Sequence, residues 1–503
     1  MSDPASTRGA ELRADSPIAA GAAQRTWILT ASVVLILMTG IEGTVIATAM
    51  PTIVGHLGGF ELFSWVFSAY FLSQGVTIPI YGRLADILGR KRVLFFGLSL
   101  FLIGTTLCGF APNMPSLIVF RVIQGVGAGA VQPVNQTLIG DMYPPAMRAR
   151  MAGFFSSVWG IAAIIGPVLG AFVISRAEWY WVFWVTVPIG IAAFLLLAFA
   201  LHETIERRAH RIDYSGAALM ALGIGLVMYA FIQAQALGIA RFCAMLGLSL
   251  AILAAFVVRE HYAAEPILPL SLLRNRILAC GNIACFGVGC VVMASTTFLP
   301  AYVQGVMGRT PLIAGYVLAV SSVTWIAGSA SGGRIMLRSS YRMATMVGAL
   351  FLIWGIAMLI LLNPTRGPLW AAVGTGLVGI GMGLTQNTYT VSAQSCVDWS
   401  RRGTATSLIA FSRMLGQTIG TAIYGGVVNV SLAGLLGGDA VERIMEPALR
   451  DKLGAQAGEV LLAVSDAIRN VYWVAGFFVA LVVIAGLALP KGLSPTRPAH
   501  PPK

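Results

Sequence analysis

Long apolar segments alternate with short polar turns along almost the whole chain, and the turns carry Pro, Gly or charged residues. We count fourteen such segments, which centre near residues 38, 72, 101, 127, 162, 190, 224, 250, 290, 323, 352, 381, 416 and 481. An α-helix needs about 20 mostly apolar residues to cross the hydrocarbon core of a bilayer, and it satisfies its own backbone hydrogen bonds there. The pattern therefore predicts an all-α polytopic membrane protein with 14 transmembrane helices.

The composition agrees with this class. The 503-residue chain is 57% hydrophobic and only 11% charged, whereas soluble domains are about half apolar and a quarter charged. Its net charge of +13 could indicate a nucleic-acid partner. However, the basic residues are scattered over many turns instead of forming one stripe, so we expect no nucleic-acid binding.

The basic residues also predict the topology. An even number of spans places both termini on one side of the membrane. Most of the 33 Lys and Arg residues fall on one side when alternate loops and both tails are assigned to it, and basic loops are typical of the cytoplasmic side. We therefore expect both termini in the cytosol, with the protein in the cytoplasmic membrane of a bacterium. The first 25 residues lack an apolar core before the first span, so we expect no cleaved signal peptide.

The chain contains an internal repeat. A charged hairpin from Gly82 to Arg92 has two glycines, one acid and four bases, and a worn copy without the acid runs from Gly333 to Arg342, 251 residues later. Three residues of the fourth span recur 254 residues later: Gly127, Gly129 and Gln132 as Gly381, Gly383 and Gln386. Membrane carriers are commonly built from such repeats, with the binding site at their interface.

The repeat predicts six helices in each half and two helices between the halves. The expected domains are a cytoplasmic tail (1–25), a six-helix bundle (26–201), linkers with two additional transmembrane helices (202–277), a second six-helix bundle (278–489) and a cytoplasmic tail (490–503). Residues 430–471 are expected to form a long loop outside the cell.

The hairpin resembles the cytoplasmic signature loop of the major facilitator superfamily, and the six-two-six arrangement resembles its fourteen-span drug:H⁺ antiporter branch. In that family the loop latches the two halves in one conformation. The resemblance implies a latch made by Gly82, Asp86, Gly89, Arg90 and Arg402. Because a carboxylate is favourable at a helix N-terminus, we expect Asp86 to dock at the start of the thirteenth span and to pair with Arg90 in the outward-open state.

Glu42 is the candidate for proton coupling, because no other acid lies in the middle of a span. An ionisable group costs roughly 2.5 to 3.5 kcal/mol in the bilayer centre and is a functional candidate by default. The residues from Ile41 to Pro51 resemble a pattern of the antiporter branch, with Glu in place of its usual Asp. The corresponding place in the second half, Val291 to Met293, has no carboxylate. The alternative is a packing acid that is permanently paired with an Arg.

Arg121 is the expected partner of the coupling acid. It opens a segment of the fourth span that resembles the family's R-x-x-Q-G-x-G-A pattern. Arg remains charged when buried, so it can bias a nearby carboxyl group toward losing its proton. A snorkelling or loop-bracing role is the alternative. Polar and aromatic residues in the spans are the candidates for substrate binding: Gln124, Gln132, Asn135, Gln386, Asn387, Tyr70, Trp159 and Tyr389.

Gly160, Gly166, Pro167 and Gly170 in the fifth span resemble the antiporter signature of the superfamily, and only its last glycine differs. The resemblance implies export by exchange. A proline kink flanked by glycines also lets a helix bend against its neighbour, so an ordinary kink in a packed helix is the alternative. Arg413 is a second Arg within a span, and the sequence leaves open whether it serves substrate or structure.

The sequence excludes most other classes. It contains no G-K-[ST], H-E-x-x-H or G-x-S-x-G motif, so an ATP-driven pump or a membrane enzyme is not expected. The six cysteines form no C-x-x-C pair, and we expect neither a metal nor a cofactor besides the proton gradient. The leading hypothesis is a monomeric, proton-coupled exporter of amphipathic or cationic drugs. A carrier of the same fold for a lipid, peptide or metabolite is the alternative, and a periplasmic adaptor remains unknown.

Overall fold

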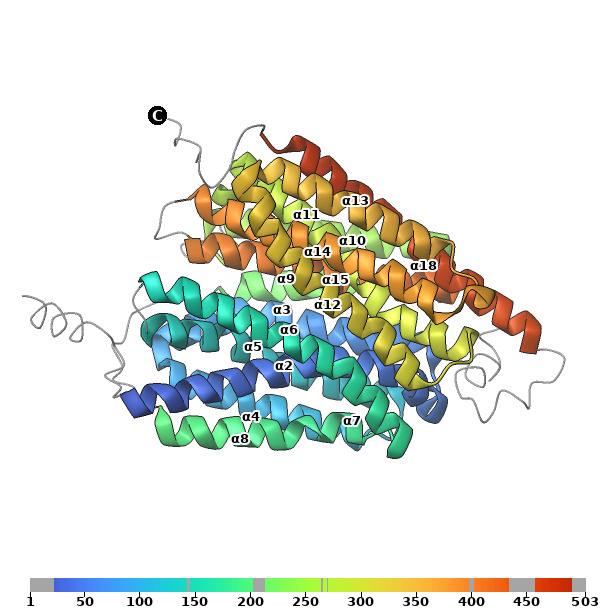
Figure 1. Ribbon diagram of the computed structural model, residues 1–503, viewed down its shortest axis with the longest axis horizontal. Helices are drawn as coiled ribbons and strands as arrows, with labels where there is room; N and C mark the ends of the chain where they lie inside the picture. The colour runs from blue at the N-terminus through green and yellow to red at the C-terminus, as the bar shows by residue number, and fades with distance from the viewer. Residues whose placement is uncertain are drawn as a thin grey trace, which may run out of the picture.

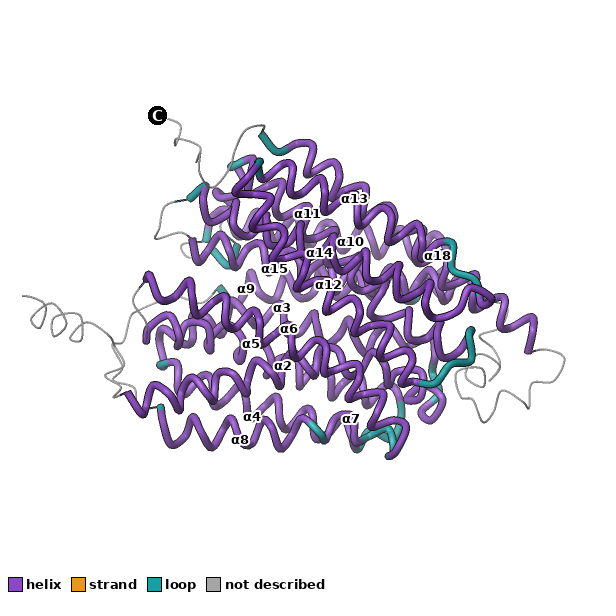
Figure 2. The backbone as a smooth tube through the Cα atoms, in the orientation of Figure 1, coloured by secondary structure: helices purple, strands orange, loops and turns teal. Residues whose placement is uncertain are grey.

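The computed structural model describes residues 22–142, 145–201, 213–263, 266–268, 270–397, 402–433 and 457–490. These residues form helices joined by short turns (Figures 1 and 2). The first half comprises α2 (Ala22–Leu57), η1 (Phe60–Leu62), α3 (Phe63–Leu88), α4 (Arg90–Gly109), α5 (Met114–Met142), α6 (Pro145–Arg176), α7 (Trp181–Trp184) and α8 (Thr186–Ala200).

Two helices follow before the second half, namely α9 (Tyr214–Ile232) and α10 (Ala234–Tyr262). The second half comprises η2 (Leu270–Arg274), α11 (Arg276–Ala301), η3 (Tyr302–Val306), α12 (Pro311–Arg338), α13 (Tyr341–Ile360), η4 (Pro364–Arg366), α14 (Gly367–Ser395), α15 (Arg402–Ser431) and α18 (Ala457–Ala488). In Figure 1 the first half lies below and the second half above, with α9 between them.

The all-helical membrane fold is confirmed, but the number of spans is confirmed only in part. The described residues form fourteen helices of membrane-spanning length, and twelve candidate spans are long and apolar enough to cross a bilayer. The two long helices that are absent from these candidates are α3 and α15. They pack against each other, and the Ser68 hydroxyl of α3 donates to the Thr418 carbonyl of α15 over 3.4 Å. Other polar side chains of these helices contact their own half, such as Thr77 of α3 with the Val126 carbonyl of α5 and Ser412 of α15 with Asn282 of α11. The polarity of α3 and α15 therefore serves contacts between helices.

The same close helix crossing occurs in both halves. In the first half, a methyl group added at Gly97 of α4 would lie 3.1 Å from the Gly127 carbonyl of α5. In the second half, a methyl group added at Gly348 of α13 would lie 3.0 Å from the Gly381 carbonyl of α14. Small residues allow this close approach of backbones in membranes. The four glycines follow the offsets of the sequence repeat, which therefore preserves a packing geometry.

The two halves contact each other mainly at one end of the molecule. We call the end where α2 begins and α18 ends the terminal end, and the other the distal end. At the distal end the rings of Phe63 and Phe298 lie 5.6 Å apart, and the Gln304 amide donates to the Thr48 carbonyl over 2.9 Å. One apolar cluster there contains residues of both halves.

At the terminal end each half has a cluster of its own. The cluster of the first half includes Leu94, Leu138 and Leu197, and that of the second half is formed around Met336 and Tyr341. Among the residues that the structure describes, the clusters that include both halves are the one at the distal end and a smaller one along α9, where α3 and α15 meet. The molecule is therefore closed at the distal end.

The additional helix α9 packs against both α3 and α15 and so covers one side of the contact between the halves. The Asn429 amide of α15 bonds to the Ile232 carbonyl of α9 over 3.1 Å and to the Glu61 carbonyl of the first half over 3.0 Å. Asp213 caps the start of α9 by accepting from the Gly216 amide over 3.0 Å. Burial alone would raise the pKa of Asp213, but hydrogen bonds from Gly216 and Ser215 and the nearby Arg259 lower it.

Some expected segments lie outside the described residues. These are most of the N-terminal tail, the first linker, residues 434–456 of the expected outside loop and the C-terminal tail. Where the loop is described, helices extend into it: α15 continues to Ser431 and α18 begins at Ala457.

Candidate functional site

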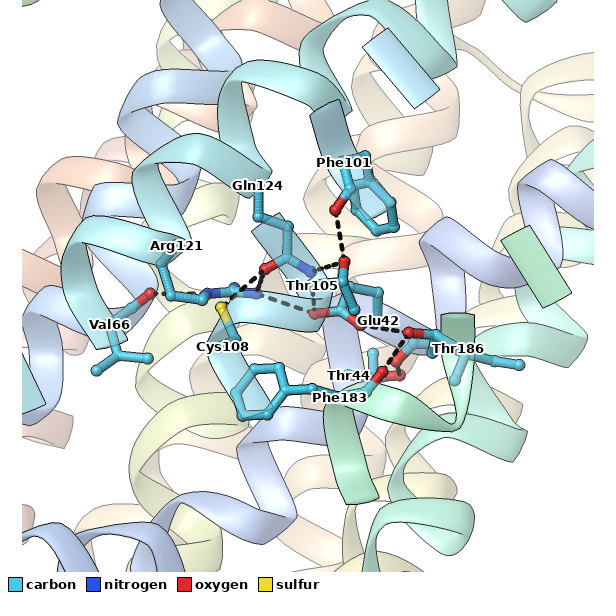
Figure 3. Close-up of polar contacts among 11 residues, drawn as sticks. Glu42, Thr44, Val66, Phe101, Thr105, Cys108, Arg121, Gln124, Phe183 and Thr186 are labelled. Carbon is cyan, nitrogen blue, oxygen red and sulfur yellow. Dashed lines mark hydrogen bonds and ion pairs between the residues drawn. The ribbon is translucent and has the colours of Figure 1, made fainter. Parts of the chain in front are cut away.

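Glu42 lies near the middle of α2 and is only 1% exposed. Its Oε1 atom accepts two hydrogen bonds, one from Arg121 Nη1 at 3.0 Å and one from Gln124 Nε2 at 2.7 Å. Both donors come from α5, one turn apart, so they reach the same oxygen from the same side (Figure 3). The structure thus brings the proton-coupling candidates Glu42 and Arg121 into direct contact.

Arg121 is itself held on several sides. It is 2% exposed, and its Nε donates to the Val66 carbonyl of α3 over 3.2 Å. Its Nη1 also donates to Gln124 Oε1 over 2.5 Å, and its guanidinium carbon lies 4.1 Å from the centre of the Tyr70 ring. Four directed contacts fix the cation, so the ion pair with Glu42 has a defined geometry. This arrangement excludes a snorkelling role for Arg121.

The second oxygen of Glu42 faces a different helix. Its Oε2 accepts from the Thr186 hydroxyl at the start of α8 over 3.2 Å, and the same hydroxyl lies 2.8 Å from the Phe183 carbonyl. Behind the amide of Gln124, the Thr105 hydroxyl of α4 accepts from Gln124 Nε2 over 2.8 Å. The sequence analysis missed both threonines. Thr186 had a weak signal, because it is a lone hydroxyl in the apolar run from Val185 to Ala200.

The whole network lies inside the first half, among α2, α3, α4, α5 and α8. Charges in a protein interior are costly unless each is paired and hydrogen-bonded. Here Glu42 has three donors and Arg121 has an anion, an amide, a carbonyl and an aromatic ring. The site can hold one carboxyl group beside one permanent cation, so protonation of Glu42 would change its net charge from neutral to positive.

The antiporter-motif residues lie where α6 crosses α2 and α12. A methyl group added at Gly170 would lie 2.5 Å from Thr48 Oγ1 of α2, and one added at Gly160 would lie 2.7 Å from Ile326 Cδ1 of α12. The Pro167 carbonyl accepts from the Thr48 hydroxyl over 3.3 Å. At Gly166 the same addition would overlap the side chain of Thr44. The small residues therefore allow α6 to contact its own half and the opposite half simultaneously.

Two of the eight substrate-binding candidates, Gln124 and Tyr70, belong to the Glu42 network. A third, Trp159, lies between the two halves. Trp159 of α6 packs edge-on against Trp325 of α12, with ring centres 4.6 Å apart. This pair forms part of the contact between the halves.

The remaining candidates differ in exposure. On α5, Gln132 is exposed, while Asn135 is buried and donates to the Ser32 carbonyl over 3.4 Å. On α14, Asn387 donates to the Ser329 carbonyl of α12 over 2.9 Å, and Gln386 is half-buried. Tyr389 is completely buried and lies against Gly281 of α11. All eight substrate-binding candidates stay predictions.

The expected latch is described only in part, because the side chains of Asp86 and Arg402 lie outside the described residues. Gly89 joins α3 to α4 with a φ of 92°, a left-handed conformation that glycine adopts without strain. Arg90 is half-buried at the start of α4. Among the described residues, no atom lies within 4 Å of a methyl group added at Gly82, and the same is true of Gly333 in the worn copy. In this conformation the hairpin glycines thus border open space at the terminal end.

Solved structures of known transporters have the same fold. A bacterial homologue of the human lysosomal transporter Spinster, in an inward-facing and occupied conformation, matches with a TM-score of 0.65 at 15% identity, over 93% of this chain and 97% of that one. A D-xylose-proton symporter matches with a TM-score of 0.61 at 13% identity, over 93% of this chain and 98% of that one.

Other relatives have higher sequence identity to this chain than these solved structures do. Multidrug resistance protein 3 of Bacillus subtilis (strain 168) is 32% identical over 91% of this chain and 93% of its own. The multidrug transporter protein MdtP of the same strain is also 32% identical, over 82% of this chain and 77% of its own. The multidrug efflux pump SdrM of Staphylococcus aureus (strain N315) is 29% identical over 78% of this chain and 88% of its own.

The Major Facilitator Superfamily family model matches residues 32–421. This range contains the hairpin, the Glu42 network and the repeat. The chain therefore belongs to the major facilitator superfamily and is a multi-pass membrane transporter, not an enzyme.

Proposed function

We propose that this transporter is a proton-coupled antiporter that exports amphipathic drugs, cationic ones included, across the cytoplasmic membrane by alternating access. The observation that carries the proposal is Glu42, a buried carboxyl group held against Arg121 in the first half. Three of the relatives described above bear multidrug names. The antiporter-motif glycines at the crossing of α6 with α2 and α12 also support exchange over uptake.

The described conformation fits one step of such a cycle. With both termini in the cytosol, the closed distal end faces outward and the terminal end faces the cytosol. A substrate then enters from the terminal end while Glu42 is ionised and paired with Arg121. The distal end then opens and releases the substrate outside. Protonation of Glu42 there removes its charge pairing with Arg121 and favours the return of the carrier to the conformation that is open to the cytosol. We expect the carrier to do this as a monomer.

The test is drug export from cells or vesicles that contain the wild type or the Glu42→Gln variant. We expect the variant to lose uphill export of ethidium while it still binds ethidium, because Gln keeps the hydrogen bonds but cannot exchange a proton. A proton uncoupler should reduce the wild type to the same level. Glu61→Gln is the matched control, since Glu61 is an exposed acid at the distal end.

Two outcomes would contradict the proposal. Unchanged uphill export by Glu42→Gln would exclude Glu42 from coupling and would favour the alternative of a permanently paired packing acid. Export that is insensitive to the uncoupler would exclude a proton-driven mechanism altogether.

A further inference from the structure

The two carboxyl oxygens of Glu42 have different partners, and the difference determines where a proton can reside. Oε1 accepts from Arg121 Nη1 and from Gln124 Nε2. A guanidinium group only donates, so the Gln124 oxygen must face Arg121 and its NH₂ group must face Glu42. Neither donor can turn round to accept a proton from Oε1. A proton on that atom would meet two N–H groups, so Oε1 is excluded as the protonated oxygen.

The partner of Oε2 can reverse the direction of its hydrogen bond. The Thr186 hydroxyl carries one hydrogen but lies within reach of two acceptors, Glu42 Oε2 at 3.2 Å and the Phe183 carbonyl at 2.8 Å. It can donate to only one of them at a time, and its own oxygen can accept. Both atoms are buried, with Thr186 completely inaccessible, so water does not substitute for the missing bond.

We propose that the transported proton is carried on Glu42 Oε2 and that Thr186 is the positioning residue for it. In the ionised state the Thr186 hydroxyl donates to Oε2. When the distal end opens and a hydronium ion transfers its proton to Oε2, one O–H bond of hydronium breaks, an O–H bond forms on Oε2, and a water molecule leaves. The new O–H group donates to Thr186 Oγ1, and the Thr186 hydroxyl rotates to donate to the Phe183 carbonyl. The inference rests on the proposed function, because it assigns the atoms of the same proton site.

This arrangement leaves every polar group satisfied in both charge states. An unpaired buried polar group is costly, and a half-satisfied network is worse than an apolar one. The rotation of one hydroxyl avoids that cost, while Arg121 and Gln124 keep their places on the other oxygen. Thr186 is the first residue of α8, directly after the α7 turn at the distal end. Thr186 and the fixed cation thus lie on opposite sides of the carboxyl group (Figure 3).

Few other groups that titrate or carry charge face this carboxyl group. They are Arg121 of α5, Tyr70 of α3 and Cys108 of α4. Among the described residues, α8 contributes only the hydroxyl of Thr186 to Glu42. A change at Thr186 therefore alters the hydrogen bonding of Oε2 without removing a charge.

The test is infrared titration of the purified full-length protein in lipid nanodiscs, without any substrate. The C=O band of the neutral carboxyl group is assigned by its absence in Glu42→Gln. In Thr186→Val we expect that band to move to higher frequency and its pH midpoint to shift, because the O–H group on Oε2 has lost its acceptor. Proton-driven export should fall about tenfold or more, as loss of a hydrogen bond to a charged group predicts.

Two variants act as controls. Thr186→Ser keeps the hydroxyl and should retain the wild-type band and midpoint. Thr39→Val makes the same change one turn away on α2, where the hydroxyl bonds only to carbonyls of its own helix, and should also leave both unchanged. If Thr186→Val fails to fold, Thr186→Ala makes the same comparison with a smaller side chain.

The outcomes separate the two claims. A Glu42 band that titrates in Thr186→Val as in the wild type overturns the role of Thr186 and leaves the coupling role of Glu42 intact. A wild type without any titrating band that Glu42→Gln removes overturns both. A shift that Thr39→Val reproduces indicates general loosening of the bundle and also overturns the role of Thr186.

Discussion

At the scale of single residues, the two arginines within spans have opposite surroundings. Arg121 has an anion within 3.0 Å. Arg413 of α15 has no ion pair among the described residues: its Nη1 donates to Gln417 Oε1 over 3.2 Å, and its Nε is buried without a partner. Arg413 is half-buried, and a cation within a span that has no anion beside it is a functional candidate. We interpret Arg413 as a group that interacts with the acidic part of some substrates.

This interpretation predicts the behaviour of Arg413→Gln. We expect no loss of thermal stability, because the change removes an uncompensated charge and Gln can still bond to Gln417. Export of amphipathic compounds that carry a carboxylate should fall about tenfold relative to neutral analogues, the size expected for one hydrogen bond to a charged group. The measurement is export of matched acid and ester pairs, together with the melting temperature.

Arg413→Lys is the control, since it keeps the charge and should retain most of the preference for acids. A variant Arg413→Gln that is less stable and exports acids and esters equally well would assign Arg413 a structural role.

The sequence predicted some residues of the Glu42 site and not others. Glu42 and Arg121 could be predicted because a charge within an apolar span is costly and therefore marks a functional candidate. Gln124 could be found one turn from Arg121, although its role in orienting Glu42 could not. The role of Thr186 could not be predicted, because a lone Thr in a span ordinarily bonds to its own helix. Thr186 is 144 residues from Glu42 in the sequence, and only the fold brings its hydroxyl beside Glu42 Oε2.

At the scale of helices, glycines that look alike in the sequence have different surroundings. At Gly97 an added methyl group would overlap Ala130 of α5, so this glycine is needed for the α4–α5 crossing. At Gly82 it would meet no atom of the described residues within 4 Å. Gly82 is therefore not needed for packing in the described conformation.

Gly82→Val should consequently fold normally and still fail in transport. The added side chain has room while the terminal end is open, but it would obstruct closure of α3 against the second half. We expect export to fall at least about tenfold with the melting temperature unchanged, whereas Gly97→Val should destabilise the protein by about 1–3 kcal/mol through overpacking. Transport assays and thermal unfolding of both variants check this.

Normal transport by Gly82→Val would contradict this prediction. If Gly82→Val exports normally, the hairpin glycine is not a contact of the alternative conformation, and the predicted latch at Gly82 and Asp86 loses its support.

At the scale of the whole molecule, the contacts between the halves predict which end can be locked. Thr48 and Gln304 meet at the distal end, with the amide 2.9 Å from the carbonyl. The Phe63 and Phe298 side chains also face each other there, with ring centres 5.6 Å apart. In a background without the exposed Cys243, we expect Phe63→Cys with Phe298→Cys to be cross-linked by oxidation in this conformation. Oxidation should abolish transport but retain drug binding from the terminal end, and reduction should restore transport.

Each single-cysteine variant is the control and should be insensitive to oxidant. Full transport by the oxidised double variant would mean that the distal end need not open, which would contradict alternating access.

The sequence by itself determined the membrane class, the helices, the duplication and the buried pair of Glu42 and Arg121, because hydrophobic length, the cost of a buried charge and the repeat offsets are local or one-dimensional signals. Its fourteen spans are confirmed in part, since twelve are apolar enough to cross a bilayer and α3 and α15 are more polar helices of similar length. Only the tertiary structure decided which oxygen of Glu42 faces Arg121 and which faces Thr186. Hydrogen bonds between distant helices depend on angstrom-scale packing, and no periodicity along the chain encodes that.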